Sequence, residues 1–176
     1  MNNIPPNVYY SIGDCNDSCN SYSSKIGDCN TSTDGSTSTS MYASNTSGGS
    51  ISFGLGGGAS NISLPNNQNI NKFSVDPTNT SFIVLESGRY YITYQVNTTA
   101  SLGVGAGTRI LRNGAAIPGT ILTPALGTST YNNDCIASLN AGDTLSLQLF
   151  STILLIATLL SANGSVGAAL TIIKLQ

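Results

Sequence analysis

The chain has 176 residues, of which 8% are charged, and its formal net charge is −2. An ordinary soluble domain carries about 25% charged residues, so this surface has to be built from Ser, Thr, Asn and Gly. Six Lys and Arg residues in total exclude a basic patch for nucleic acid. The absence of His removes the commonest general base and zinc ligand. A neutral surface repels its neighbours weakly, which favours assembly.

Residues 1–13 form a short apolar segment without charged side chains. Pro5 and Pro6 impose an extended polyproline-like start, and Val8 to Ile12 have strand character. This segment is interpreted either as a frayed terminus or as a strand that docks on a neighbouring subunit. It shows no basic start followed by an apolar stretch, so we expect synthesis without a signal peptide.

Residues 14–40 are rich in Ser and Thr and are predicted to be a flexible spacer. They contain Cys15, Cys19 and Cys29; the fourth cysteine, Cys135, lies far along the chain. Three interpretations of the cysteines are open: free thiols, disulfides between subunits, or a metal site. A Cys-x3-Cys pair without His fits zinc poorly, and Cys135 alone fits a small core residue.

From residue 41 onward the sequence predicts short strands separated by turns. Ser50 to Leu55 alternates, with Ile51, Phe53 and Leu55 on one face, and 61–72 is predicted to be a loop. The central stretch Phe82 to Val96 indicates strand, turn at Gly88, strand. In its second half Tyr90, Ile92, Tyr94 and Val96 share one face, while Arg89, Tyr91, Thr93 and Gln95 share the other.

The later strands are marked by turn signals. Asn113-Gly114 is the strongest hairpin signal, and Asn163-Gly164 is a second one. Strands are predicted at 107–111, 130–139, 144–150, 152–160 and 166–175. Eight to ten strands at regular spacing and no convincing helix indicate an all-β sandwich or barrel.

The strands 152–160 and 166–175 are apolar on both faces apart from a few positions, which is typical of strands buried on both sides. A two-sheet sandwich exposes one of these sides, so we expect self-association to cover it. The stretch Leu145 to Leu160 is too short and too interrupted by polar residues for a membrane-spanning helix. Two buried strands explain it, and we expect no membrane partner.

Four motifs occur in a recognisable order: Met41 to Leu55, Phe82 to Val96 with its Ser-Gly-Arg-Tyr-Tyr turn, Leu139-Asn-Ala-Gly-Asp-Thr-Leu-Ser-Leu147, and Val166 to Leu175. Together with Asn113-Gly114 and Pro118-Gly119, they resemble the carboxy-terminal domain of BclA, a collagen-like glycoprotein of the Bacillus exosporium. The resemblance covers about 41–176. It implies a homotrimeric jelly roll of the kind found in tumour necrosis factor and complement globular heads.

The resemblance has one large departure, because a Cys-bearing spacer and the 1–13 segment stand where BclA has a collagen-like stalk. The chain therefore looks more like an Ena-type endospore appendage subunit, made of trimers stacked head-to-tail. The resemblance implies docking residues in the first segment: Ile4, Pro5, Pro6, Val8, Tyr9, Tyr10 and Ile12. It also implies trimer contacts from the strands expected to be buried on both sides: Tyr90, Tyr94, Leu149, Leu170 and Ile172.

No residue pattern indicates catalysis, so no enzyme activity, cofactor or metal is expected. Glu86 and Asp143 sit at predicted turns, where carboxylates are ordinary capping residues. Asp134, beside Asn132 and Asn133, is the one place where calcium would be sought. The glycines at 103–107 lack the spacing and the Lys-Ser/Thr of a phosphate loop.

Three functions remain open from the sequence. The first is the structural subunit of a spore-surface fibre, whose partners are itself and other spore-surface proteins at the fibre ends. The second is a trimeric head that binds a receptor or sugar. The third is an anchor whose first segment binds a basal-layer partner. All three lie on the spore surface, and deletion of residues 2–13 discriminates among them.

Overall fold

Thirteen strands and one 3-10 turn, Ala162–Gly164, occupy residues 38–176, the part of the chain that this computed structural model describes. The docking segment at 1–13 and Cys15, Cys19 and Cys29 lie outside the described residues. The strands, in chain order, are β1 (Ser40–Asn45), β2 (Gly49–Phe53), β3 (Gly58–Asn61), β4 (Asn66–Asn71), β5 (Phe73–Val75), β6 (Phe82–Val84), β7 (Gly88–Leu102), β8 (Ala106–Arg112), β9 (Ala115–Ala116), β10 (Thr128–Leu139), β11 (Thr144–Ser151), β12 (Leu155–Leu159) and β13 (Ala168–Lys174).

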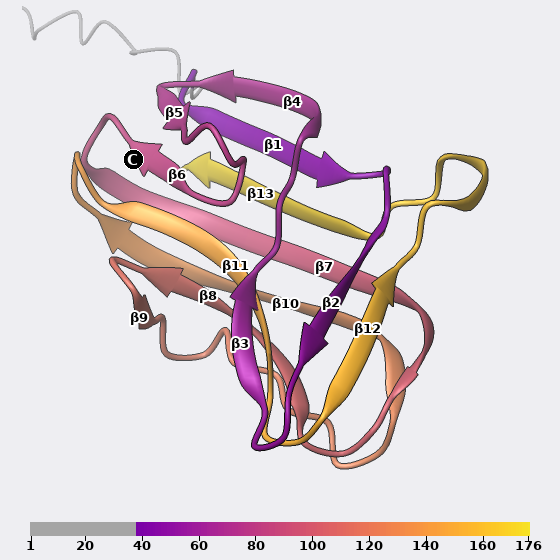
Figure 1. Cartoon of the computed structure of the whole chain (residues 1–176). Coiled ribbons are helices and arrows are strands. Elements are labelled where there is room, and N and C mark those ends of the chain that lie inside the picture. The colour runs from indigo at the N-terminus through magenta and orange to yellow at the C-terminus, as the bar shows by residue number, and fades with distance from the viewer. Residues whose placement is uncertain (1–37) are drawn as a thin grey trace, which may run out of the picture. The chain divides into compact units, whose positions relative to one another are not determined.

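The strands form two antiparallel sheets that face each other (Figure 1). The first sheet has the order β2-β12-β7-β13-β1-β4, and β10 pairs with the other edge of β7. The second has the order β5-β6-β11-β8-β9, and β3 also pairs with β11. The expected all-β sandwich is therefore confirmed.

Alternation along the strands builds the core between the sheets. Tyr90, Ile92, Tyr94 and Val96 of β7 are buried, and so are Leu145, Leu147 and Leu149 of β11 on the opposing sheet. Each such side chain contributes about 1.5–3 kcal/mol by leaving water. The predicted alternation of both strands is confirmed.

The Asn113-Gly114 hairpin is also confirmed. Both residues have positive φ, 53° and 81°, and they join the paired strands β8 and β9. This is the backbone that a two-residue type I′ hairpin requires.

Several local expectations are corrected. β6 and β7 belong to different sheets, so the segment around Glu86 crosses between layers. Asn163-Gly164 connects β12 to β13, which both pair with β7 and not with each other. The side chain of Leu55 is 93% exposed because it lies at the tip of the turn closed by the Gly54–Gly57 bridge. The predicted loop at 61–72 contains β4.

Candidate self-association face

The outer face of the first sheet is a four-strand surface formed by β10, β7, β13 and β1. Strand register sets its residues in three transverse rows, which we call the outer face. The rows are Ile136, Tyr91, Ile173 and Ser40; then Asp134, Thr93, Thr171 and Tyr42; then Asn132, Gln95, Ala169 and Ser44. Ala169 and Ser44 are buried, so the third row is exposed at Asn132 and Gln95. Residues of one row are cross-strand neighbours, about 4.5–5.5 Å apart at Cβ.

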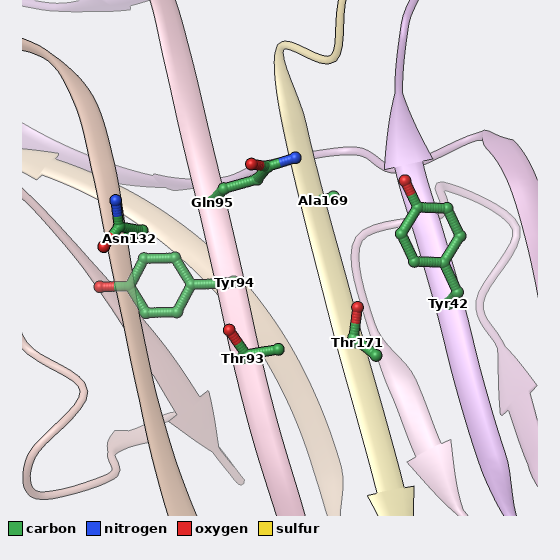
Figure 2. Close-up of a pocket in the computed structure, with 7 residues that line it drawn as sticks. All are labelled: Tyr42, Thr93, Tyr94, Gln95, Asn132, Ala169 and Thr171. Carbon is green, nitrogen blue, oxygen red and sulfur yellow. The ribbon is translucent and has the colours of Figure 1, made fainter.

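A shallow depression of about 410 Å³ lies on this face. Figure 2 shows Thr93 and Gln95 on β7 beside Ala169 and Thr171 on β13, with Asn132 of β10 and Tyr42 of β1 at the two sides. Its lining offers hydroxyls and amides but no charged side chain. Tyr94 also borders it, although its hydroxyl bonds Thr108 and Thr120 in the core.

The composition of the outer face suits a protein partner. Its rows contain two Tyr and two Ile, and Asp134 is their one charged residue. Protein interfaces are enriched in aromatic residues and depleted of charge at their centre. Thr93 and Thr171, cross-strand partners at the middle of the face, are small enough to let another subunit approach closely.

The five residues predicted as trimer contacts are core residues of the single chain. Tyr90, Tyr94, Leu149, Leu170 and Ile172 are all in the core of the single chain, with at most 3% of each residue exposed. Their side chains therefore offer no surface to a neighbouring subunit. The residues of the same strands that do face outward are the alternate ones, such as Tyr91, Thr93 and Thr171.

Cys135 faces inward. It pairs with Ile92 across β10 and β7, and its half-buried side chain packs against the core. Burial, and secondarily the charge of Asp134, raise the pKa of its thiol. A neutral, inward-facing thiol is a poor nucleophile for disulfide exchange. Cys135 therefore behaves as a small core residue in the described part of the chain.

The carboxylates considered in the sequence accept hydrogen bonds and form ion pairs that hold neighbouring segments of the chain in place. Asp143 accepts hydrogen bonds from the Asn140 main chain at 2.9 Å and from Asn113 Nδ2 at 2.7 Å. The Asn140 bond first, then the Asn113 bond, with the Arg112 charge adding to them, lower the pKa of Asp143 against a smaller effect of burial. The two turns that Asn113 and Asp143 occupy are thereby joined.

Glu86 connects Thr39, which directly precedes β1, to Lys174 at the end of β13. It accepts a hydrogen bond from Thr39 Oγ1 at 2.6 Å and forms ion pairs with Lys174 at 3.4 Å and Lys72 at 3.5 Å. The Thr39 bond first, and then the Lys174 and Lys72 interactions, lower the pKa of Glu86 despite some desolvation. Exposed ion pairs of this kind add little to stability, so their main effect is positional.

Asp76 holds the loop that follows β5. Its carboxylate accepts from the main chains of Thr78, Thr80 and Ser81 and from the Thr78 hydroxyl. Desolvation raises the pKa of Asp76, but these hydrogen bonds outweigh it and the net pKa is lowered. Asp134 and Asn132 point to the outer face, whereas Asn133 points inward. Within residues 38–176, no three Cys, Asp or Glu residues cluster as metal ligands would.

A comparison with protein-family models matches residues 41–176 to the BclA C-terminal domain. The chain belongs to this family. A comparison with curated protein sequences found no match. The match covers the sandwich from its first strand to its last, and it confirms the resemblance read from the motifs.

Solved structures give the fold of this BclA C-terminal domain. The crystal structure of murine APRIL at pH 8.5 is 14% identical with a TM-score of 0.55, over 77% of this chain and 97% of that chain. Murine APRIL at pH 8.0 is 14% identical with a TM-score of 0.51, over the same shares of the two chains. Eiger TNF from S. frugiperda is 14% identical with a TM-score of 0.49, over 78% of this chain and 92% of that chain. The domain is a jelly roll of the tumour necrosis factor type.

The described residues contain no helix of the length and hydropathy that a membrane crossing requires. The stretch Leu145 to Leu160, examined for that reason in the sequence, forms most of β11 and all of β12. The two strands belong to different sheets. This agrees with the two-strand interpretation.

Proposed function

We propose that this chain is a structural subunit of the spore surface, whose jelly roll forms a homotrimer through the outer face. The observation that carries the proposal is the sparsely charged, Tyr- and Ile-bearing surface across four strands, in a domain of the BclA C-terminal family. Three-fold closure places this one face of each subunit against a different patch of the next. No catalytic role, cofactor or metal belongs to the proposal.

We further propose that the trimers stack head-to-tail into a fibre, each docking segment at 1–13 binding the neighbouring trimer. A contact between unlike surfaces that does not close on itself produces a filament. Three segments per junction would act together and raise the effective affinity without any new contact. Other spore-surface proteins would bind at the fibre ends.

The trimer is tested by placing a large cation at the centre of the outer face. Thr171→Arg inserts a long charged side chain between Thr93 and Tyr42, its neighbours in the row. Ser74→Arg is the matched control, since Ser74 is exposed on β5 of the second sheet. Light scattering coupled to size exclusion should show a monomer for Thr171→Arg and a trimer for Ser74→Arg. A trimer of unchanged stability for both variants would refute this face.

The fibre is tested by negative-stain electron microscopy of the purified chain beside a version without residues 2–13. Fibres from the full chain and single particles from the truncated one are expected. Separate trimers from both would contradict polymerisation and leave a trimeric surface head that another protein holds in place.

A further inference from the structure

The charged residues of the sandwich gather at one of its two ends. Of the nine in residues 38–176, six surround the start of β7 and the end of β13 or lie in the turns beside them. They are Lys72, Glu86, Arg89, Arg112, Asp143 and Lys174. Asp76, Arg109 and Asp134 lie along the flanks. The loops at the other end carry no charge.

That other end, which we call the apolar end, is formed by four loops at the bottom of Figure 1. They follow β2, β7, β9 and β11, and main-chain contacts hold them together: Thr152 N donates to Gly105 O at 3.0 Å, and Gly57 packs against Ser151 and Thr152. The large hydrophobic side chains exposed on these loops and on β12 are all aliphatic: Leu55, Val104, Ile121, Leu126, Ile153, Leu154 and Ile156. Leu126 is 81% exposed and Ile156 67%.

The apolar end also presents unprotected strand edges. β2 ends the order of the first sheet, and β3 pairs only with β11. The two strands follow each other through the Gly54–Gly57 turn but separate into different sheets. Neither contains a charged residue or a proline, the usual protection of an edge. Unpaired main-chain groups beside aliphatic side chains are the elements that bind an extended peptide.

The chain enters the sandwich at the opposite end. Thr39 O accepts from Lys174 N at 3.0 Å, and the Thr39 hydroxyl bonds Glu86. In a head-to-tail stack, the charged end of one head therefore faces the apolar end of the next. In such a stack, Thr39 of one head lies on the side that faces the next head.

We infer that the apolar end is the docking site for residues 4–12 of a neighbouring subunit, added as a strand along the free edge of β2 or β3. The inference rests on the proposed function and names the surface that it uses. The occupant matches the site, because residues 1–13 contain Ile4, Val8, Tyr9, Tyr10 and Ile12 and no charged side chain.

Reach does not limit this contact. The 26 residues between Ile12 and Thr39 span at most about 90 Å, whereas the 15 residues of β7 measure about 50 Å. The same length would let a segment fold back on its own head, so the test has to separate docking between chains from docking within one.

The first experiment compares fibres of the full chain with those of Leu154→Asp and Ile156→Asp. Leu85→Asp is the matched control, because Leu85 is 51% exposed and lies beside Lys72 at the charged end. Trimer mass and circular dichroism should be unchanged in all three. Electron microscopy should show at least a ten-fold loss of fibre length for the first two variants and none for the third. Fibres of normal length from Leu154→Asp and Ile156→Asp would overturn the site.

The second experiment locates the segment even in a preparation without fibres. Tyr10 is replaced by the photoreactive p-benzoylphenylalanine in chains mixed with isotopically heavy unmodified chains, and the crosslinks are mapped after chymotryptic digestion. Crosslinks from light Tyr10 positions to heavy peptides around Leu55, Leu154 or Ile156 support the inference. Crosslinks confined to light peptides, or to the outer face, overturn it. If the wild-type chain forms no fibres, the proposed head-to-tail stack is refuted, and the crosslinks still decide whether the segment docks at the apolar end.

Discussion

The hydroxyl of Tyr94 in the first sheet donates a hydrogen bond to the main-chain oxygen of Thr120, 2.8 Å away on the side of the second sheet. Its oxygen also lies 3.0 Å from Thr108 Oγ1 of β8. All three residues are buried. A phenol in the apolar core thus joins the two layers at a fixed point, and burial raises the pKa of its hydroxyl although the Thr108 bond acts in the opposite direction.

Replacing Tyr94 with Phe should lower the free energy of unfolding by about 1–3 kcal/mol, because the Thr120 oxygen loses its buried donor. Tyr131→Phe is the control, since Tyr131 is equally buried in the same core. Urea unfolding followed by circular dichroism measures both. Equal losses for the two variants would mean that the cross-sheet hydrogen bond adds nothing to the fold.

Gly57 and Gly56 are adjacent, both with positive φ, but only Gly57 is enclosed. A Cβ at Gly57 would overlap the Ser151 oxygen and lie 2.7 Å from the Thr152 main chain, whereas a Cβ at Gly56 meets nothing within 4 Å. Gly56→Ala should cost about 1–2 kcal/mol for its backbone conformation. Gly57→Ala should cost about 1–3 kcal/mol more through overpacking. Thermal unfolding of the two variants side by side checks this, and equal losses would contradict the packing of these loops.

The Asp143 carboxylate should make stability depend on acid. Hydrogen bonds lower the folded-state pKa of Asp143. The ionised carboxylate therefore adds to the free energy of unfolding in full above the unfolded-state pKa near 3.8. That contribution is lost as pH falls through the lowered folded-state value. Asp143→Asn should therefore be about 1–3 kcal/mol less stable at pH 7.

Unfolding measured from pH 7 down to pH 2 should show the wild-type and Asp143→Asn curves converging at the acidic end. The wild-type carboxyl is then itself protonated and offers little more than the amide does. A difference between the two chains that stays constant over the whole range would show that the charge of Asp143 does not stabilise the turns.

Cys135 should react slowly in the folded chain. Burial and the neighbouring Asp134 raise the pKa of its thiol, so less thiolate is present at pH 8. With Cys15, Cys19 and Cys29 replaced by Ser, labelling by Ellman's reagent should be at least about ten-fold slower in buffer than in urea. Asp134→Asn should speed the folded reaction modestly. Labelling at the same rate in both solvents would place this thiol at the surface.

The sequence indicated the strands that obey period two and the turn that has one strong signal. Alternation in β7 and β11 places an apolar side chain at every second position, and Asn113-Gly114 allows only a narrow choice of backbone. The family motifs lie on these same elements. They located the domain correctly because its core and its turns impose their own residue types.

Other elements left no such signal. β3 and β4, Gly58–Asn61 and Asn66–Asn71, consist largely of Gly, Asn and Ser, which disfavour strands. They are extended because β11 and β1 supply partners for their main chains. β6 and β7 are close in sequence, yet only the assembled core decides that they pair with different neighbours.

The five predicted trimer contacts are buried within the single chain, for a physical reason. In β7 both faces carry Tyr, and in β13 both carry Ile, so hydropathy does not say which face meets the second sheet. Trimer contacts were predicted at Tyr90, Tyr94, Leu170 and Ile172, which the opposing sheet covers. The alternate positions, led by Thr93 and Thr171, have the lower hydropathy expected of a face that meets solvent in the single chain.

The unequal distribution of charge along the sandwich means that its two ends respond oppositely to the medium. Added salt screens the exposed ion pairs around Glu86, whereas kosmotropic ions such as sulfate strengthen contacts between aliphatic surfaces such as Leu154 and Ile156. High salt would thus weaken the ion pairs at the charged end while leaving contacts made through the other end intact or stronger.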